Sequence, residues 1–232
     1  LKANAAVALD KAQKVTLPDV RITIGDQALR NDGPIEFSSG KAGDLNLLAA
    51  IMEEGGGRLS MDMSVRPSKS AVLRVSGKEI HLGPWAKLFQ APAISGQGAV
   101  ELDYRETAGQ TPEAHVNASI NEIGLDAADD MPSFDLRMDG SMTRQAFDGT
   151  MTVSHAAMPI AQAEAHMTIG LSLLEPKLVF SETDPVSATV MLDTEIGDYW
   201  QYAPLSDHVL FGHLSMNARL SGSLKQPEVN WL

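Results

Sequence analysis

Apolar and polar residues alternate with a period of two along most of the chain, which is the pattern of a β-strand with one apolar face. From position 59, Leu59, Met61 and Met63 alternate with Ser60 and Asp62. The same alternation recurs near residues 100–104, 116–120, 134–138, 167–173, 188–192 and 214–220. Because every second side chain of a strand lies on the same side of its sheet, these segments predict strands that share one apolar face.

Turn-forming sequences separate the alternating segments. They include Asp32-Gly33-Pro34, the glycines at 55–57, Pro67-Ser68, Gly109 to Pro112, Asp139-Gly140, Asp148-Gly149, Glu175-Pro176 and Asp184-Pro185. Short turns of this kind join antiparallel strands, whereas parallel strands need crossover helices of ten or more residues, which the pattern lacks. We therefore expect an all-β, elongated antiparallel sheet rather than a doubly wound α/β fold.

Helical signals are short. Pro84, followed by Trp85, Leu88 and Phe89 at helical spacing, predicts one amphipathic turn. Asp198 predicts the start of a second turn, which Trp200 follows. The Ala-rich residues 1–14 suit a helix or a strand equally, so both alternatives stay open there.

The two aromatic turns belong to an apparent internal repeat. Gly83, Trp85, Gly96, Leu102 and Glu113 are echoed, at a nearly constant offset, by Gly197, Trp200, Gly212, Met216 and Glu228. A constant offset indicates a duplicated structural unit. We expect a first segment at 1–82, a repeat unit at 83–196 and the start of another at 197–232, all within one continuous β domain.

Composition narrows the classes of function. The chain has 232 residues and a formal net charge of −12, from 30 acidic and 18 basic residues. Without clustered basic residues, binding to nucleic acid is not expected. There is no cysteine, hence no thiol nucleophile and no disulfide. No apolar run is long enough to cross a bilayer as a helix, and because the chain begins at Leu1 we expect it to be part of a longer protein.

The residue types that usually carry catalysis do not form a recognisable motif. The six histidines lack the spacing of zinc ligands, and nucleophile-elbow, Walker and dinucleotide-binding motifs do not occur. We therefore predict that the chain is not an enzyme and needs no metal or cofactor.

The apolar face itself is the remaining candidate site, either as an ordinary sandwich core or as an open apolar groove. Methionine-rich faces adapt to varied apolar ligands, which favours a groove. The predicted lining is Leu59, Met61, Met63, Val65, Val100, Leu102, Val116, Ile120, Phe134, Leu136, Met138, Met167, Ile169, Leu171, Val190, Leu192, Leu214, Met216 and Leu220. The predicted plug at the end of the groove is Trp85, Leu88, Phe89 and Trp200.

Three segments together resemble the TamB family of AsmA-like proteins of the Gram-negative envelope. They are Leu17-Pro18-Asp19-Val20-Arg21-Ile22, Gly96-Gln97-Gly98-Ala99-Val100-Glu101-Leu102 and the strand ending Leu220-Ser221-Gly222-Ser223-Leu224-Lys225-Gln226-Pro227-Glu228-Val229. The family phrase is a glycine, an alternating strand, a step of small residues, then Leu, two polar residues, Pro and another strand. It is complete near the C-terminus and degraded near 109–112.

The resemblance implies a fold and a function. The fold is an antiparallel sheet curled into an open hydrophobic trough, or β-taco. The protein would be the periplasmic portion of an inner-membrane-anchored bridge that shields phospholipid acyl chains between the two membranes. Its partners would be an outer-membrane barrel of the Omp85 class and nascent outer-membrane proteins. Two alternatives are a scaffold that pairs its edge strands with barrel proteins, and a closed lipid-binding β domain.

Overall fold

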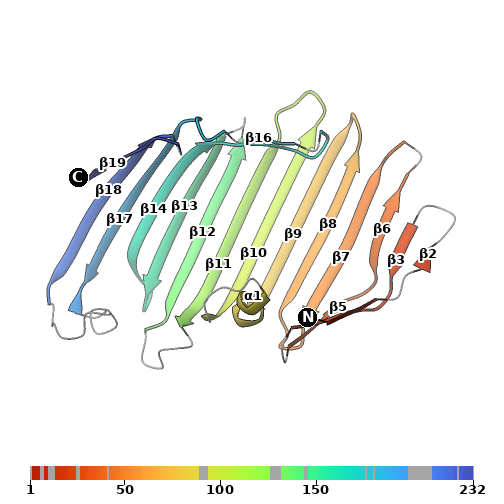
Figure 1. Ribbon diagram of the computed structural model, residues 1–232, viewed down its shortest axis with the longest axis horizontal. Helices are drawn as coiled ribbons and strands as arrows, with labels where there is room; N and C mark the ends of the chain where they lie inside the picture. The colour runs from red at the N-terminus through yellow and green to blue at the C-terminus, as the bar shows by residue number, and fades with distance from the viewer. Residues whose placement is uncertain are drawn as a thin grey trace.

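A computed structural model shows an all-β protein, with one short helix, α1, among the elements of the residues it describes (Figure 1). The structure describes residues 2–5, 8–9, 14–24, 27–40, 42–88, 94–125, 132–143, 146–175, 177–179, 181–197, 211–223 and 225–231. Almost all of its strands belong to one antiparallel sheet, and that sheet is not closed into a barrel. The predicted fold class, an open antiparallel all-β sheet, is therefore confirmed.

The main sheet contains 17 strands, and two further short strands pair only with each other. The N-terminal strands are β1 Lys2–Ala5, β2 Ala8–Leu9, β3 Lys14–Leu17, β4 Val20–Ile24, β5 Gln27–Asn31, β6 Ile35–Ser39 and β7 Leu45–Glu53. The central strands are β8 Arg58–Arg66, β9 Ser70–His81, β10 Ile94–Thr107, β11 Glu113–Leu125, β12 Phe134–Thr143, β13 Ala146–His155 and β14 Met158–Thr168. The small pair is β15 Gly170–Ser172 with β16 Lys177–Val179, and the sheet ends with β17 Val186–Glu195, β18 His213–Gly222 and β19 Pro227–Trp231.

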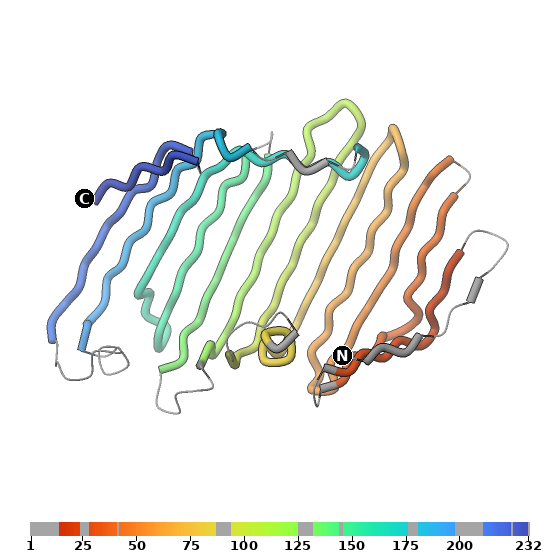
Figure 2. The backbone as a smooth tube through the Cα atoms, viewed as in Figure 1, coloured from red at the N-terminus to blue at the C-terminus, as the bar shows by residue number. Residues whose placement is uncertain are grey.

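From β7 onward the sheet is a meander in which each strand pairs with the next along the chain, β14 with β17 included. At the N-terminal end, β5 and β6 lie end to end along β7, and β4 and β3 pair with them in turn. The backbone trace shows the strands of the meander side by side (Figure 2). At roughly 4.8 Å per strand, more than a dozen strands give a sheet on the order of 60 Å wide.

The sheet curls at the end of the strands where α1 (Leu82–Leu88) lies. Helix α1 contacts both β10 and β4, although β5, β7, β8 and β9 separate these two strands in the sheet. A flat sheet could not bring β4 and β10 to one helix. This curvature opens toward the side on which the helix sits.

Three predictions about local structure are corrected. Asp139-Gly140 and Asp148-Gly149 do not form turns but lie inside β12 and β13, where Gly140 pairs directly with Gly149. The glycines are there because the Phe147 ring lies over them, and an added Cβ at either position would approach that ring to 2.8 Å. Asp32-Gly33-Pro34 is likewise a break between the collinear β5 and β6, not a hairpin turn.

The third correction concerns Ile169 and Leu171, which were expected to continue one long strand. Strand β14 ends at Thr168, and the chain then leaves the main sheet to form the β15–β16 pair. The short helix predicted from Pro84 is confirmed as α1. The described residues among 1–14 form strands, so the helical alternative is wrong for them. The turn predicted at Asp198 lies outside the described residues.

Candidate functional site

Directly paired residues of antiparallel strands point to the same side of a sheet, so the register assigns each side chain to a face. Three neighbouring rows of paired residues cross the sheet without a charged side chain, and apart from the Tyr104 hydroxyl and the Trp231 indole N–H their side chains are wholly apolar. The middle row is Ala49, Met61, Val75, Leu102, Val116, Gly140, Gly149, Ala165, Ala188, Leu220 and Val229. We call the face formed by these rows the apolar face.

The two flanking rows have the same apolar character; the first reaches β19 and the second ends at β17. The first is Ile51, Leu59, Gly77, Val100, Ala118, Met138, Met151, Ala163, Val190, Ala218 and Trp231. The second is Leu47, Met63, Leu73, Tyr104, Ala114, Met142, Phe147, Met167 and Val186. The apolar face is therefore an uninterrupted track that runs across the strands from β7 toward β19.

All predicted lining residues except Ile169 and Leu171 lie on this face by register. Their role toward lipid stays a prediction. Sequence reasoning missed members of the same rows, namely Leu73, Val75, Met142, Phe147, Met151 and Val186. Phe147 and Met151 could have been found by counting Gly149 as an apolar position of an alternating strand. Leu73 and Val75 were harder to find, because the apolar Val72 interrupts the alternation there.

The described residues leave most of the apolar face uncovered. The chain exposes 15008 Å² of surface, whereas a compact monomer of this mass exposes roughly 10,000 Å². Most side chains of the three rows are half-buried, and Val190 and Trp231 are 38% and 69% exposed. Sheets normally bury their apolar face against a second layer, which the described residues supply only in part.

One partial cover lies at the end of the strands where Thr107 ends β10. Residues 169–174, which we call the strap, cross the apolar face there (Figure 1). The strap side chains of Ile169, Leu171, Leu173 and Leu174 pack against a buried cluster of Val65, Ala71, Tyr104 and Met142. Ile169 and Leu171 are thus part of a cover over the track and not part of its floor.

A buried carboxylate holds the strap in place. Glu106 is 9% exposed. It lies on the apolar face of β10, two residues beyond Tyr104 and next to the second flanking row. Glu106 Oε2 accepts hydrogen bonds from Tyr104 Oη at 2.9 Å, Leu173 N at 2.8 Å and Leu174 N at 3.0 Å, while Oε1 accepts one from Ser172 Oγ at 2.7 Å. These four bonds occupy about all the acceptor positions of a carboxylate.

These contacts shift two pKa values. Burial by itself would raise the pKa of the Glu106 carboxyl, but the hydrogen bonds from Ser172, Leu174, Tyr104 and Leu173 outweigh it and hold the pKa below its ordinary value. Burial raises the pKa of Tyr104, and the neighbouring Glu106 carboxylate raises it further. Glu106 is therefore ionised and Tyr104 neutral at physiological pH.

A second buried carboxylate anchors helix α1 at the opposite ends of the strands. Glu53 is 7% exposed, and its Oε1 accepts a hydrogen bond from Trp85 Nε1 at 2.7 Å. Its Oε2 accepts one from the backbone N–H of His81 at 3.0 Å and lies 2.9 Å from His81 Nδ1. Trp85 is thus at one end of the curl; the side chains of Leu88, Phe89 and Trp200 lie outside the described residues, so the plug as a whole stays a prediction.

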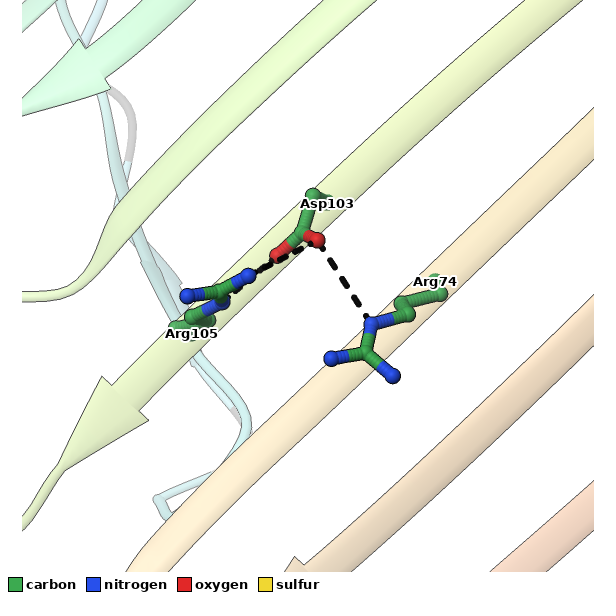
Figure 3. A network of polar contacts seen from close by, with 3 residues as sticks. All are labelled: Arg74, Asp103 and Arg105. Atoms are coloured by element: carbon green, nitrogen blue, oxygen red, sulfur yellow. Dashed lines mark hydrogen bonds and ion pairs between the residues drawn. The ribbon is translucent and has the colours of Figure 1, made fainter.

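The opposite face is polar and carries cross-strand charges. Asp103 lies between two arginines, with Arg105 Nε at 2.9 Å and Arg74 Nε at 3.5 Å (Figure 3). The hydrogen bond from Arg105, reinforced by Arg74, holds the pKa of Asp103 below its ordinary value. Asp148 lies 2.6 Å from His166 Nδ1 on the same face. Exposed pairs of this kind contribute about 0–1 kcal/mol each, so they keep this face hydrated more than they stabilise the fold.

A broad hollow of about 930 Å³ also lies on the polar face. Its charged lining includes Arg74, Glu101, Asp103, Asp148 and Arg219, whose register places them opposite the apolar rows. Val75, Leu102 and Val116 of the middle row also border it, between these charged neighbours. A hollow lined by carboxylates does not suit an acyl chain, so we do not assign it to the track.

The described residues contain no group of three His, Cys, Asp or Glu side chains arranged to hold a metal ion. Within the same residues, no helix is long and apolar enough to span a bilayer. Comparisons of the chain with protein-family models, with curated proteins and with solved structures found no match. The candidate function is therefore argued from the geometry of the two faces.

Proposed function

We propose that the apolar face shields the acyl chains of phospholipids as they pass between two membranes. The single observation that carries this proposal is the set of three apolar rows, which cross the sheet without a charged side chain. In this proposal the chain is the periplasmic portion of an inner-membrane-anchored protein similar to the TamB family. Its partner would be an outer-membrane barrel of the Omp85 class.

The geometry suits a lipid with a polar head group. A strand of about ten residues spans roughly 33 Å, so the strands are long enough to accommodate a whole acyl chain in the curl. Removing methylene groups from water contributes about 0.8 kcal/mol each. The head group stays in solvent along the open side of the sheet, and transfer along the rows needs no catalytic residue.

Lipid bound to the purified chain tests the proposal. We expect the chain, isolated from a Gram-negative host, to carry phospholipid that native mass spectrometry and solvent extraction detect. The Leu102→Asp variant places a carboxylate in the middle row and should lose that lipid. Ser76→Asp, on the polar face of the adjacent strand β9, is the matched control and should retain it. Chains that carry no lipid, or equal lipid in both variants, would contradict the proposal.

The free edge of the sheet favours a second candidate function. All five residues of β19 are exposed, including Val229 at 52% and Trp231 at 69%, and β19 pairs only with β18 among the described strands. An unpaired strand edge can add a strand of another protein through backbone hydrogen bonds. Photo-crosslinkers separate the two functions, because position 102 should capture lipid if the track is used, while position 230 should capture an outer-membrane protein if the edge is used.

A further inference from the structure

The strap occupies the surface that a lipid would use. Leu171, Leu173 and Leu174 pack against the buried cluster that includes Tyr104 and Met142 of the second flanking row, and Tyr104 is 0% exposed. Most side chains of the middle row and of the first flanking row are only half-buried. The leucines of the strap thus cover part of one row with apolar groups, and in the proposed function acyl chains would cover all three rows in the same way.

The strap is attached in a way that permits its removal. It lies outside the main sheet and pairs only with β16. Its polar attachments to the floor of the track are made by Tyr104 and Glu106, near the ends of β10 and next to the exposed Thr107. If the strap lifts, water can reach the Glu106 carboxylate at this rim, so opening does not leave a buried charge without partners.

We propose that the strap is a displaceable lid on the track, held closed by Glu106 and exchanged for acyl chains when lipid binds. This inference rests on the proposed function. Opening removes leucine contacts from the row of Tyr104 and Met142, and the incoming methylene groups restore apolar contact at the same place. Because one apolar cover replaces another, the net free-energy difference between the closed and lipid-filled states is small, and lipid can shift the population.

Hydrogen exchange on the unmodified chain tests this directly. The amides of Leu173 and Leu174 donate to Glu106 and are protected while the strap is closed. The probe is phosphatidylethanolamine labelled with a nitrobenzoxadiazole fluorophore on its head group, and the rise in its fluorescence anisotropy reports binding. If the strap is a lid, saturating probe should accelerate exchange several-fold in a peptide covering residues 169–175. Unchanged or slower exchange with bound probe would overturn the lid and leave the track intact.

A double variant provides the second test. Leu173→Ser with Leu174→Ser weakens the strap without altering the floor and should lower the Kd of the probe several-fold. Leu48→Ser is the matched control, because Leu48 is 53% exposed and pairs with Asp62 on the polar face. An equal or weaker affinity in the double variant would overturn the lid, and if that variant does not fold, exchange on the unmodified chain decides. Absence of probe binding to every form would overturn both the track and the lid.

Discussion

The same apolar face is covered in its central part and open toward the C-terminus. In the covered part, around β8 to β12, the strap packs on Tyr104 and Met142, which are 0% and 5% exposed. In the open part, β17 to β19, Val190 and Leu214 are 38% and 36% exposed, although both alternate in sequence as regularly as the covered residues. The alternating sequence therefore produces the apolar face, whereas burial of one part of it as a core depends on contacts with a separate segment, the strap.

This difference separates two roles of equally apolar residues. Residues beneath the strap contribute to the free energy of unfolding, because folding removes them from water. Residues of the open part remain partly in water in the folded chain, so they contribute less to stability and are available to a ligand. Substitutions in the two parts should have opposite consequences for folding and for binding, and the predictions below run from the largest effect on stability to the smallest.

Met142→Asp should have the largest effect. It places a carboxylate at a buried position between its paired neighbours Ala114 and Phe147, neither of which carries a charge. We expect a loss of about 3–5 kcal/mol in the free energy of unfolding, measured by urea denaturation. Ser141→Asp, one residue away and on the polar face, should change stability by less than about 0.5 kcal/mol. Equal losses in the two variants would show that the strap does not create a core.

The strands and the residues on their apolar face could largely be predicted from the sequence, because alternation is a local pattern. Leu59, Met61 and Leu102 were assigned to one face from spacing alone, and the register agrees. The glycines at 140 and 149 were misread as turns because the same residue type permits a turn and a close aromatic contact.

The covers could not be predicted, because they depend on contacts between residues far apart in the chain. Glu106 and Ser172 are separated by 66 positions, and Glu53 and Trp85 by 32. In sequence, Glu53 and Glu106 are ordinary acidic residues near strand ends, and only the folded chain shows that they lie on the apolar face.

Gly140→Ala tests the packing between the covered and open parts. The new Cβ would lie 2.8 Å from the Phe147 ring and 2.9 Å from a methyl group of Val116, so one of them must move. We expect a loss of about 1–3 kcal/mol from overpacking, measured by the midpoint of thermal unfolding. The control Phe147→Leu with Gly140→Ala removes the ring and should recover part of that loss; no recovery would place the strain elsewhere.

Acid should loosen the covered part. The folded-state pKa of Glu106 is held below its ordinary value, so its contribution to stability is fully present above the unfolded pKa, near 4.5, and is lost as the pH falls through the lower folded value. We expect the protection factors of the Leu173 and Leu174 amides, which correct for the intrinsic pH dependence of exchange, to fall below about pH 4.5 and to stay constant from pH 5 to pH 7. In Glu106→Gln this acid-induced step should disappear. A step of equal size in that variant would assign it to another group.

Val190→Asp should have the smallest effect on stability. Val190 already contacts water, so a carboxylate there stays hydrated, and we expect a change of less than about 1 kcal/mol. It interrupts the row between Ala163 and Ala218, however, so bound phospholipid should fall sharply while the fold is retained. Thr189→Asp changes the neighbouring residue on the opposite face and should retain the lipid. If Val190→Asp instead unfolded the chain as Met142→Asp does, the open part would be a core after all, and the distinction between the two parts would fail.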